Sequence, residues 1–186
     1  MSTAKKAPAK KATATQRATT SASTEAARDT VSLAPILAAV RERLPKSRHP
    51  EGEAFVHAFY RRMSGDELPQ HTADGWAALA ADFLDFARQR KRASALVRLF
   101  NPGLKSHGWE SAHTVLQIAN DDMPFLVDSV TMALAEMGIG VHVLGHPVMP
   151  VGRDKAGKLA TVGEGARESF MHLEIDRQPQ AAMAAL

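Results

Sequence analysis

The spacing of hydrophobic and polar residues changes most clearly between residues 113 and 145. Residues 113–119 (HTVLQIA) are mostly apolar, which predicts a strand that ends at Asn120. Beyond this point apolar residues recur at three- and four-residue steps, the period of a helix with one apolar face: Leu126, Val130, Ala133 and Met137. Residues 139–145 alternate again, as a strand does. The pattern therefore predicts a strand, a helix and a second strand in succession.

Three residues predict the limits of this central helix. The Asp122 side chain is placed to accept a hydrogen bond from a free N–H group of the first turn, and Pro124 lacks the N–H that a first turn leaves unpaired. Together they predict a start at residue 123 or 124. Gly138 is the residue type that commonly ends a helix in the left-handed conformation.

Further helices are predicted in residues 30–93. The first spans 30–44 with Pro35 in its first turn, the second spans 53–63, and the third runs from a cap at Thr72 or Asp74 to about Arg92. The residues predicted to face the core are Val31, Leu33, Ile36, Leu37, Val40, Leu44, Phe55, Val56, Phe59, Met63, Trp76, Leu79, Ala80, Phe83, Phe86 and Ala87. The third helix is predicted to end in four cations, for which we favour a solvated last turn over a phosphate site: Arg88, Arg90, Lys91 and Arg92.

The remaining pattern predicts strands at residues 95–100, 148–153 and 170–175. The second of these continues the preceding strand across an irregularity at His146-Pro147 and ends in a turn at 154–157, and Trp109 is predicted to cover the core. Residues 181–186 begin another helix, and no later strand follows in this sequence. The apolar face of residues 170–175 is therefore expected on an exposed, unpaired edge: Met171, Leu173 and Ile175.

Composition and charge separate the first 29 residues from the rest. They hold no aromatic or large aliphatic residue after Met1, so they are expected to be disordered. Residues 1–24 carry five cations and no acid, whereas the rest of the 186-residue chain has 18 basic and 20 acidic residues. A solvated tail is favoured over a nucleic-acid contact because no aromatic residues are interleaved for stacking. The lack of cysteine, and of any apolar run of ~18 residues, predicts a cytoplasmic location.

Two patterns that suggest ligand binding fail on spacing. His142 and His146 would lie ~13 Å apart on a strand, too far to share one zinc ion. Gly138, Gly140 and Gly145 superficially match a dinucleotide fingerprint, but they follow a helix and do not link a strand to one. The sequence therefore predicts neither a metal site nor a cofactor site in this chain.

A ten-residue string at residues 120–129 (NDDMPFLVDS), followed by Gly-His-Pro at 145–147, resembles the N-terminal region of the large bacterial NAD-specific glutamate dehydrogenases. The resemblance extends from residue 99 to residue 178. In that family the region belongs to an ACT-like regulatory module upstream of the catalytic domain. The resemblance implies that residues 94–186 form an incomplete ACT-like β-α-β-β sandwich. With the disordered basic tail (1–29) and the helical segment (30–93) that composition and periodicity predict, the expected fold class is α+β. The sandwich would stop before its last helix and strand.

The resemblance also implies an activity. The family converts glutamate, NAD and water to 2-oxoglutarate, ammonia and NADH in amino-acid catabolism, and both NAD and the catalytic residues would lie outside this segment. The segment would serve regulation or subunit packing. Its expected partners are the remainder of the polypeptide and further copies of it, and an amino-acid effector is a further candidate. No membrane partner is expected. Two alternatives remain open: a free-standing ACT-type amino-acid sensor, and a nucleic-acid-associated protein acting through its basic tail.

The resemblance points to one candidate effector loop, formed by Asn120, Asp121, Asp122 and Met123. ACT-like modules bind amino-acid effectors between the first strand and the first helix, usually at an Asp-x-Pro-Gly motif. Here Phe125 stands in the place of the glycine, and two carboxylates would repel an acidic effector. We favour a structural turn, with Asp122 as the helix cap, over an effector site.

Overall fold

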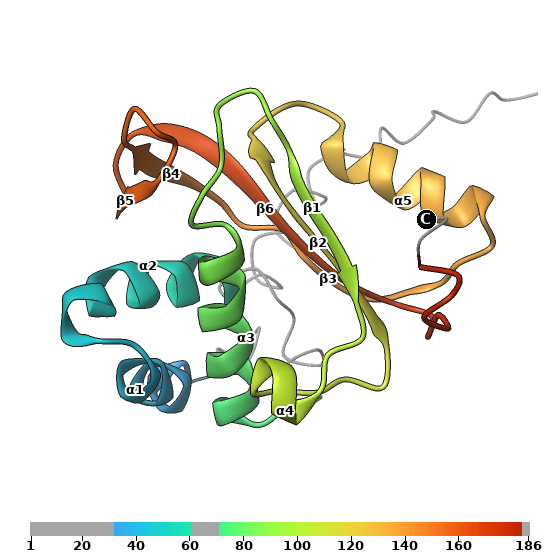
Figure 1. Ribbon diagram of the computed structural model, residues 1–186, viewed down its shortest axis with the longest axis horizontal. Helices are drawn as coiled ribbons and strands as arrows, with labels where there is room; N and C mark the ends of the chain where they lie inside the picture. The colour runs from blue at the N-terminus through green and yellow to red at the C-terminus, as the bar shows by residue number, and fades with distance from the viewer. Residues whose placement is uncertain (1–31, 61–70, 184–186) are drawn as a thin grey trace, which may run out of the picture. The chain divides into compact units, whose positions relative to one another are not determined.

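The computed structural model describes residues 32–60 and 71–183, which belong to one compact unit, Val31–Leu186. An antiparallel sheet lies between a group of helices on one face (α1, α2 and α3) and the helix α5 on the other (Figure 1). The fold is α+β, as predicted. The predicted disordered tail and Met63 lie outside the described residues. Within these ranges no helix is long and apolar enough to cross a membrane.

The helices on the first face are α1 (Ala34–Arg43), α2 (His49–Tyr60) and α3 (Ala73–Phe86), with a short 3-10 turn, η1 (Lys46–Arg48), before α2. Pro35 lies in the first turn of α1, and the Thr72 hydroxyl accepts a hydrogen bond from the Gly75 N–H at 3.1 Å, both as predicted. The prediction for α2 was four residues late, because Pro50 lies inside its first turn, where a missing N–H costs nothing.

The predicted end of the third helix is wrong. Helix α3 stops at Phe86, and the backbone that follows pairs with the edge of a strand: the Leu159 N–H donates to the Arg88 carbonyl at 2.8 Å, and the Arg90 N–H donates to the Gly157 carbonyl at 3.0 Å. These hydrogen bonds take the place of helical ones. The four cations at residues 88–92 are therefore not the solvated last turn of a helix.

The sheet is built from β1 (Leu96–Phe100), β2 (Thr114–Asp121), β3 (Val141–Gly145), β4 (Val148–Arg153), β5 (Leu159–Val162) and β6 (Ala166–Ile175). Its order is β1-β2-β6-β4-β5, and β3 also pairs with β6. Because β3 and β4 pair with successive parts of β6, they continue one line past His146 and Pro147, as predicted. A four-residue helix, α4 (Leu104–His107), lies in the connection between β1 and β2.

Strand β6 is central, which corrects the expectation of an exposed edge. It pairs with β2 on one side and with β3 and β4 on the other. In a β-α-β-β-α-β module the last strand borders the first; here β1, which comes earlier in the sequence, holds that place beside β2. Met171, Leu173 and Ile175 are consequently fully buried under α5.

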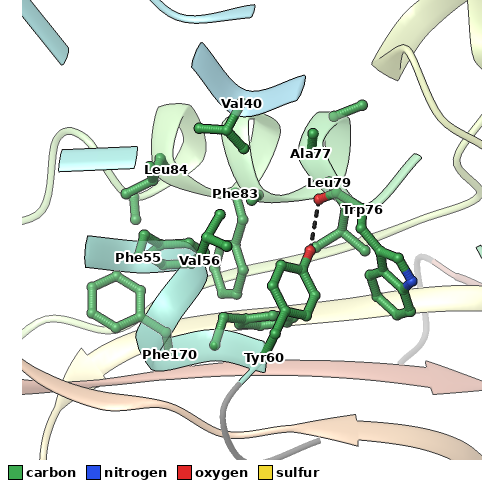
Figure 2. Close-up of a cluster of buried hydrophobic side chains, with 14 of the residues drawn as sticks. Val40, Phe55, Val56, Tyr60, Trp76, Ala77, Leu79, Phe83, Leu84 and Phe170 are labelled. Atoms are coloured by element: carbon green, nitrogen blue, oxygen red, sulfur yellow. Dashed lines mark hydrogen bonds between the residues drawn. The ribbon is translucent and has the colours of Figure 1, made fainter. Parts of the chain in front are cut away.

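The larger core lies between α1, α2, α3 and the sheet and is rich in aromatic rings (Figure 2). The Phe55 ring lies 5.6 Å from the Phe170 ring of β6, edge to face. The Tyr60 hydroxyl donates a hydrogen bond of 2.6 Å to the Trp76 carbonyl, so α2 and α3 are joined by a buried polar contact as well. Trp109 is also buried against this core, as predicted.

The second core lies under α5 (Leu126–Glu136), and here the predicted apolar face is partly wrong. Leu126 and Val130 pack against the sheet as predicted, together with Leu134. Ala133 and Met137 are exposed. These two residues lie on the flank of the helix that the sheet does not reach, so the apolar face of α5 is wider than its buried part.

Candidate functional site

The candidate effector loop lies at the junction of β2 and α5. Strand β2 is longer than predicted: Asn120 and Asp121 still pair with Ser169 and Glu168 of β6. Beyond them the Asn120 side chain contacts the Met123 sulfur at 3.5 Å, and the Met123 side chain is 53% exposed. The first two residues of the loop are thus strand and the next two belong to no regular element, while the turn lies at Pro124 and Phe125.

The Asp121 carboxylate is held by the segment that follows α3. It accepts hydrogen bonds from the Arg90 guanidinium at 2.6 Å and from the Ala93 N–H at 2.9 Å. The hydrogen bond from Arg90 is the main reason that the pKa of Asp121 lies below its ordinary value. Asp121 is therefore an ionised anchor for the residues between α3 and β1.

Arg90 belongs to a buried ionic network. Its side chain is 1% exposed and contacts the Glu168 carboxylate of β6 at 2.6 Å. Arg153 of β4 binds the same carboxylate through two hydrogen bonds, at 2.7 and 2.9 Å. Burial opposes ionisation of Glu168, but the hydrogen bonds from Arg153 and Arg90 outweigh it and lower the pKa of this carboxyl. The two positive charges of Arg90 and Arg153 are thus balanced by the two negative charges of Asp121 and Glu168.

The structure does not place Asp122 as the cap of α5. Its carboxylate accepts a hydrogen bond from Arg167 at 3.0 Å, and its N–H donates to the Arg167 carbonyl at 3.1 Å. Helix α5 starts later than predicted, at Leu126, and no side chain caps its first turn. The prediction of an Asp122 cap is wrong, because the Asp122 N–H is still bonded to β6 and the helix begins only at Leu126.

Phe125 occupies the position before α5 in the left-handed conformation, with φ of 62°. In this place the usual motif has glycine, the residue that adopts such a conformation without steric cost. The Phe125 side chain is 76% exposed, so burial does not compensate the strain. The backbone therefore retains the shape that glycine would give, although the side chain differs.

The two histidines considered as metal ligands have separate partners. The His142 ring nitrogen Nε2 lies 2.7 Å from the Asp176 carboxylate, and that of His146 lies 2.6 Å from the Ser169 hydroxyl. The glycines do not form a cofactor site either: Gly138 follows Met137, the C-cap of α5, with φ of 71°, and does not precede the N-terminus of a helix. These residues do not fit NAD, because a bound pyrophosphate needs such an N-terminus.

Sequence reasoning missed the network around Glu168. Arg90 was assigned to a solvated turn, and Arg153 and Glu168 received no role. Their partners come from four separate segments, and the pairing depends on the sheet register, which sets Glu168 opposite Asp121. The predicted strand began at Phe170. Extending its alternation back by two residues puts Glu168 on the face of the Phe170 ring, and a carboxylate on the face of an aromatic ring was the one available indication that it needed a cationic partner.

The strand order, the single helix on one face and the turn after β2 define an α+β, ACT-like module. A family model described as "Glutamate dehydrogenase, ACT1 domain" matches residues 55–186, and the chain belongs to this family.

Two curated relatives are similar to the chain. The NAD-specific glutamate dehydrogenase of Halomonas elongata is 33% identical over 150 residues, which is 77% of this chain and 9% of the relative. The NAD-specific glutamate dehydrogenase of Pseudomonas aeruginosa is 33% identical over 146 residues, 75% of this chain and 9% of the relative. The chain thus spans about a tenth of the length of these relatives. No solved structure matches it significantly.

Proposed function

We propose that this chain is the N-terminal regulatory or packing portion of an NAD-specific glutamate dehydrogenase. The complete cytoplasmic enzyme would convert glutamate, NAD and water to 2-oxoglutarate, ammonia and NADH. The observation that carries the proposal is the family match over residues 55–186, which agrees with the two named relatives. NAD and the reacting groups would be bound by parts of the polypeptide that this chain does not contain.

The contacts at the β2–α5 junction support a structural role for this turn. Arg90 and Arg167 already engage the carboxylates of Asp121 and Asp122. An effector carboxylate would have to displace one of these ion pairs, and the exposed pair with Arg167 is the weaker of the two because it is screened by solvent. An amino-acid effector at residues 120–123 therefore remains the less favoured proposal.

Exposed apolar side chains support a packing role. Met132 of α5 and Met137, the residue directly after this helix, are 62% and 56% exposed, and Val97 of β1 is 60% exposed. A contiguous patch of exposed apolar side chains marks an interaction surface, and we propose that these three side chains belong to one. We assign this surface to contacts with the remainder of the same polypeptide or with further copies in a homo-oligomer.

The test is the activity of the complete polypeptide that carries this chain. Purified enzyme should form NADH from glutamate and NAD, whereas the 186-residue chain alone should form none. Glutamate oxidation by the chain alone, or a complete polypeptide without this activity, would refute the proposal.

A further inference from the structure

A cavity of about 430 Å³ lies at the end of β6, away from the β2–α5 junction. It is lined by His71, Glu110, Ser111, Ala112, His113 and Glu174. Its volume is within the range of sites for small organic molecules, about 300–1,000 Å³. No residue of the ionic network around Glu168 is among the residues that line this cavity.

The floor of the cavity is the carboxylate of Glu174, whose side chain is only 1% exposed. His71 Nε2 lies 2.8 Å from one carboxylate oxygen, while the Ser111 hydroxyl and His113 Nδ1 contact the other. Burial opposes ionisation, but the interactions with His172, His71 and Ser111, in this order, outweigh it, and the pKa of Glu174 lies far below its ordinary value. Within the described ranges this anion has only imidazoles as ion-pair partners.

The wall of the cavity adds further negative charge. Glu110 is exposed at its rim, and the His113 ring stacks on His142 at 4.2 Å, which in turn contacts the Asp176 carboxylate. The Arg177 guanidinium donates hydrogen bonds to the carbonyls of Ser111 and His113. Two carboxylates, those of Glu174 and Glu110, line the cavity, and the described lining residues include no lysine or arginine, so the cavity attracts cations.

We propose that this cavity binds a small organic molecule through a primary ammonium group, with Glu174 and Glu110 as the anionic partners. An ammonium group carries three donors, which suits two carboxylates and the Ser111 hydroxyl. A bare metal ion fits less well, because among the described residues no three His, Asp or Glu side chains are arranged to hold one. The inference concerns this chain's own residues and does not depend on the proposed enzyme.

The probe that tests the proposal is n-butylammonium chloride, titrated into the 186-residue chain at constant ionic strength. Amide NMR signals of residues 110–113 and 174 should shift and saturate. Neither n-butanol, which has the same carbon chain without the charge, nor sodium chloride should reproduce this. An equal response to n-butanol, or a linear response identical to that of sodium chloride, would overturn the proposal.

A variant locates the binding without disturbing the core. Ala112 is exposed, so Ala112→Phe should fill the cavity, leave the fold intact and weaken n-butylammonium binding about tenfold or more, that is by at least 1.4 kcal/mol. Ala135→Phe, at an exposed position of α5, is the matched control and should bind as the unchanged chain does. Removing the rim charge by Glu110→Gln should weaken binding about threefold. Unaltered affinity in Ala112→Phe would place any binding elsewhere and overturn the assignment.

Discussion

Arg90 is the residue on which the β2–α5 junction depends most. It is buried against Glu168 and Asp121, so Arg90→Met leaves two carboxylates short of a partner and should destabilise the chain by about 3–5 kcal/mol. Arg92→Met, two residues along at an exposed position, is the control and should change stability by less than about 0.5 kcal/mol. Urea unfolding measures both. Equal losses in the two variants would show that the network contributes nothing specific.

Phe125 allows a prediction of the opposite sign. A left-handed conformation costs a non-glycine residue about 1–2 kcal/mol, whereas glycine adds about 0.5–1 kcal/mol of unfolded-state entropy. Because the side chain is largely exposed, Phe125→Gly should stabilise the chain by about 0.5 kcal/mol. Phe125→Ala keeps the strain and should give no gain. If thermal unfolding showed a clear loss for Phe125→Gly, the side chain would have a contact that this account omits.

At the scale of elements, α5 divides its apolar residues between a buried and an exposed face. Leu173 of β6 is fully buried under this helix, so Leu173→Ala should cost about 2–5 kcal/mol. Met137→Ala, on the exposed flank, should cost less than about 0.5 kcal/mol in the isolated chain. Chemical denaturation of both variants compares the two faces. A large loss for Met137→Ala would mean that this flank is covered in solution.

Most elements could be predicted from the sequence, because periodicity and caps are local. The strands at 95–100 and 170–175 and the Thr72 cap were found this way. The end of α3 was not, since residues 88–90 leave the helix to pair with β5, a partner some 70 residues distant. The central place of β6, and with it the pairing of Arg90 with Glu168, likewise depends on strand order, which no local pattern contains.

For the whole molecule, buried ionisable groups predict loss of stability in acid. Burial lowers the pKa of His172. As the pH falls through ~6.5, the unfolded chain therefore binds a proton at this histidine and the folded chain does not, so the stability of the folded chain declines below this pH. The pKa values of Asp121, Glu168 and Glu174 are also lowered. Their contribution is complete above pH ~4.5 and is lost as the pH falls further.

Urea unfolding at pH values from about 8 to about 3 measures this pH dependence, because this range extends beyond the ordinary pKa values of His, Asp and Glu, roughly 4 to 6.5, at both ends. His172→Gln should flatten the decline between about pH 6.5 and 5 and leave the decline at lower pH. Constant stability over the whole range, or a gain on acidification, would contradict the account.

We propose that this chain packs or regulates a dehydrogenase and supplies none of its reacting groups. The measurement is the rate of NADH formation from glutamate by the complete enzyme that carries both Met132→Ser and Met137→Ser, two exposed residues on and directly after α5. This rate is followed over a range of enzyme concentrations. We expect the normal rate per subunit at high concentration and a decline on dilution, because the proposed homo-oligomer, with its contacts weakened, would separate into subunits. Lys155→Ser, at an exposed turn, should behave as the unchanged enzyme. A reduced rate at every concentration, with the assembly intact, would place this chain in the catalytic machinery and contradict the claim.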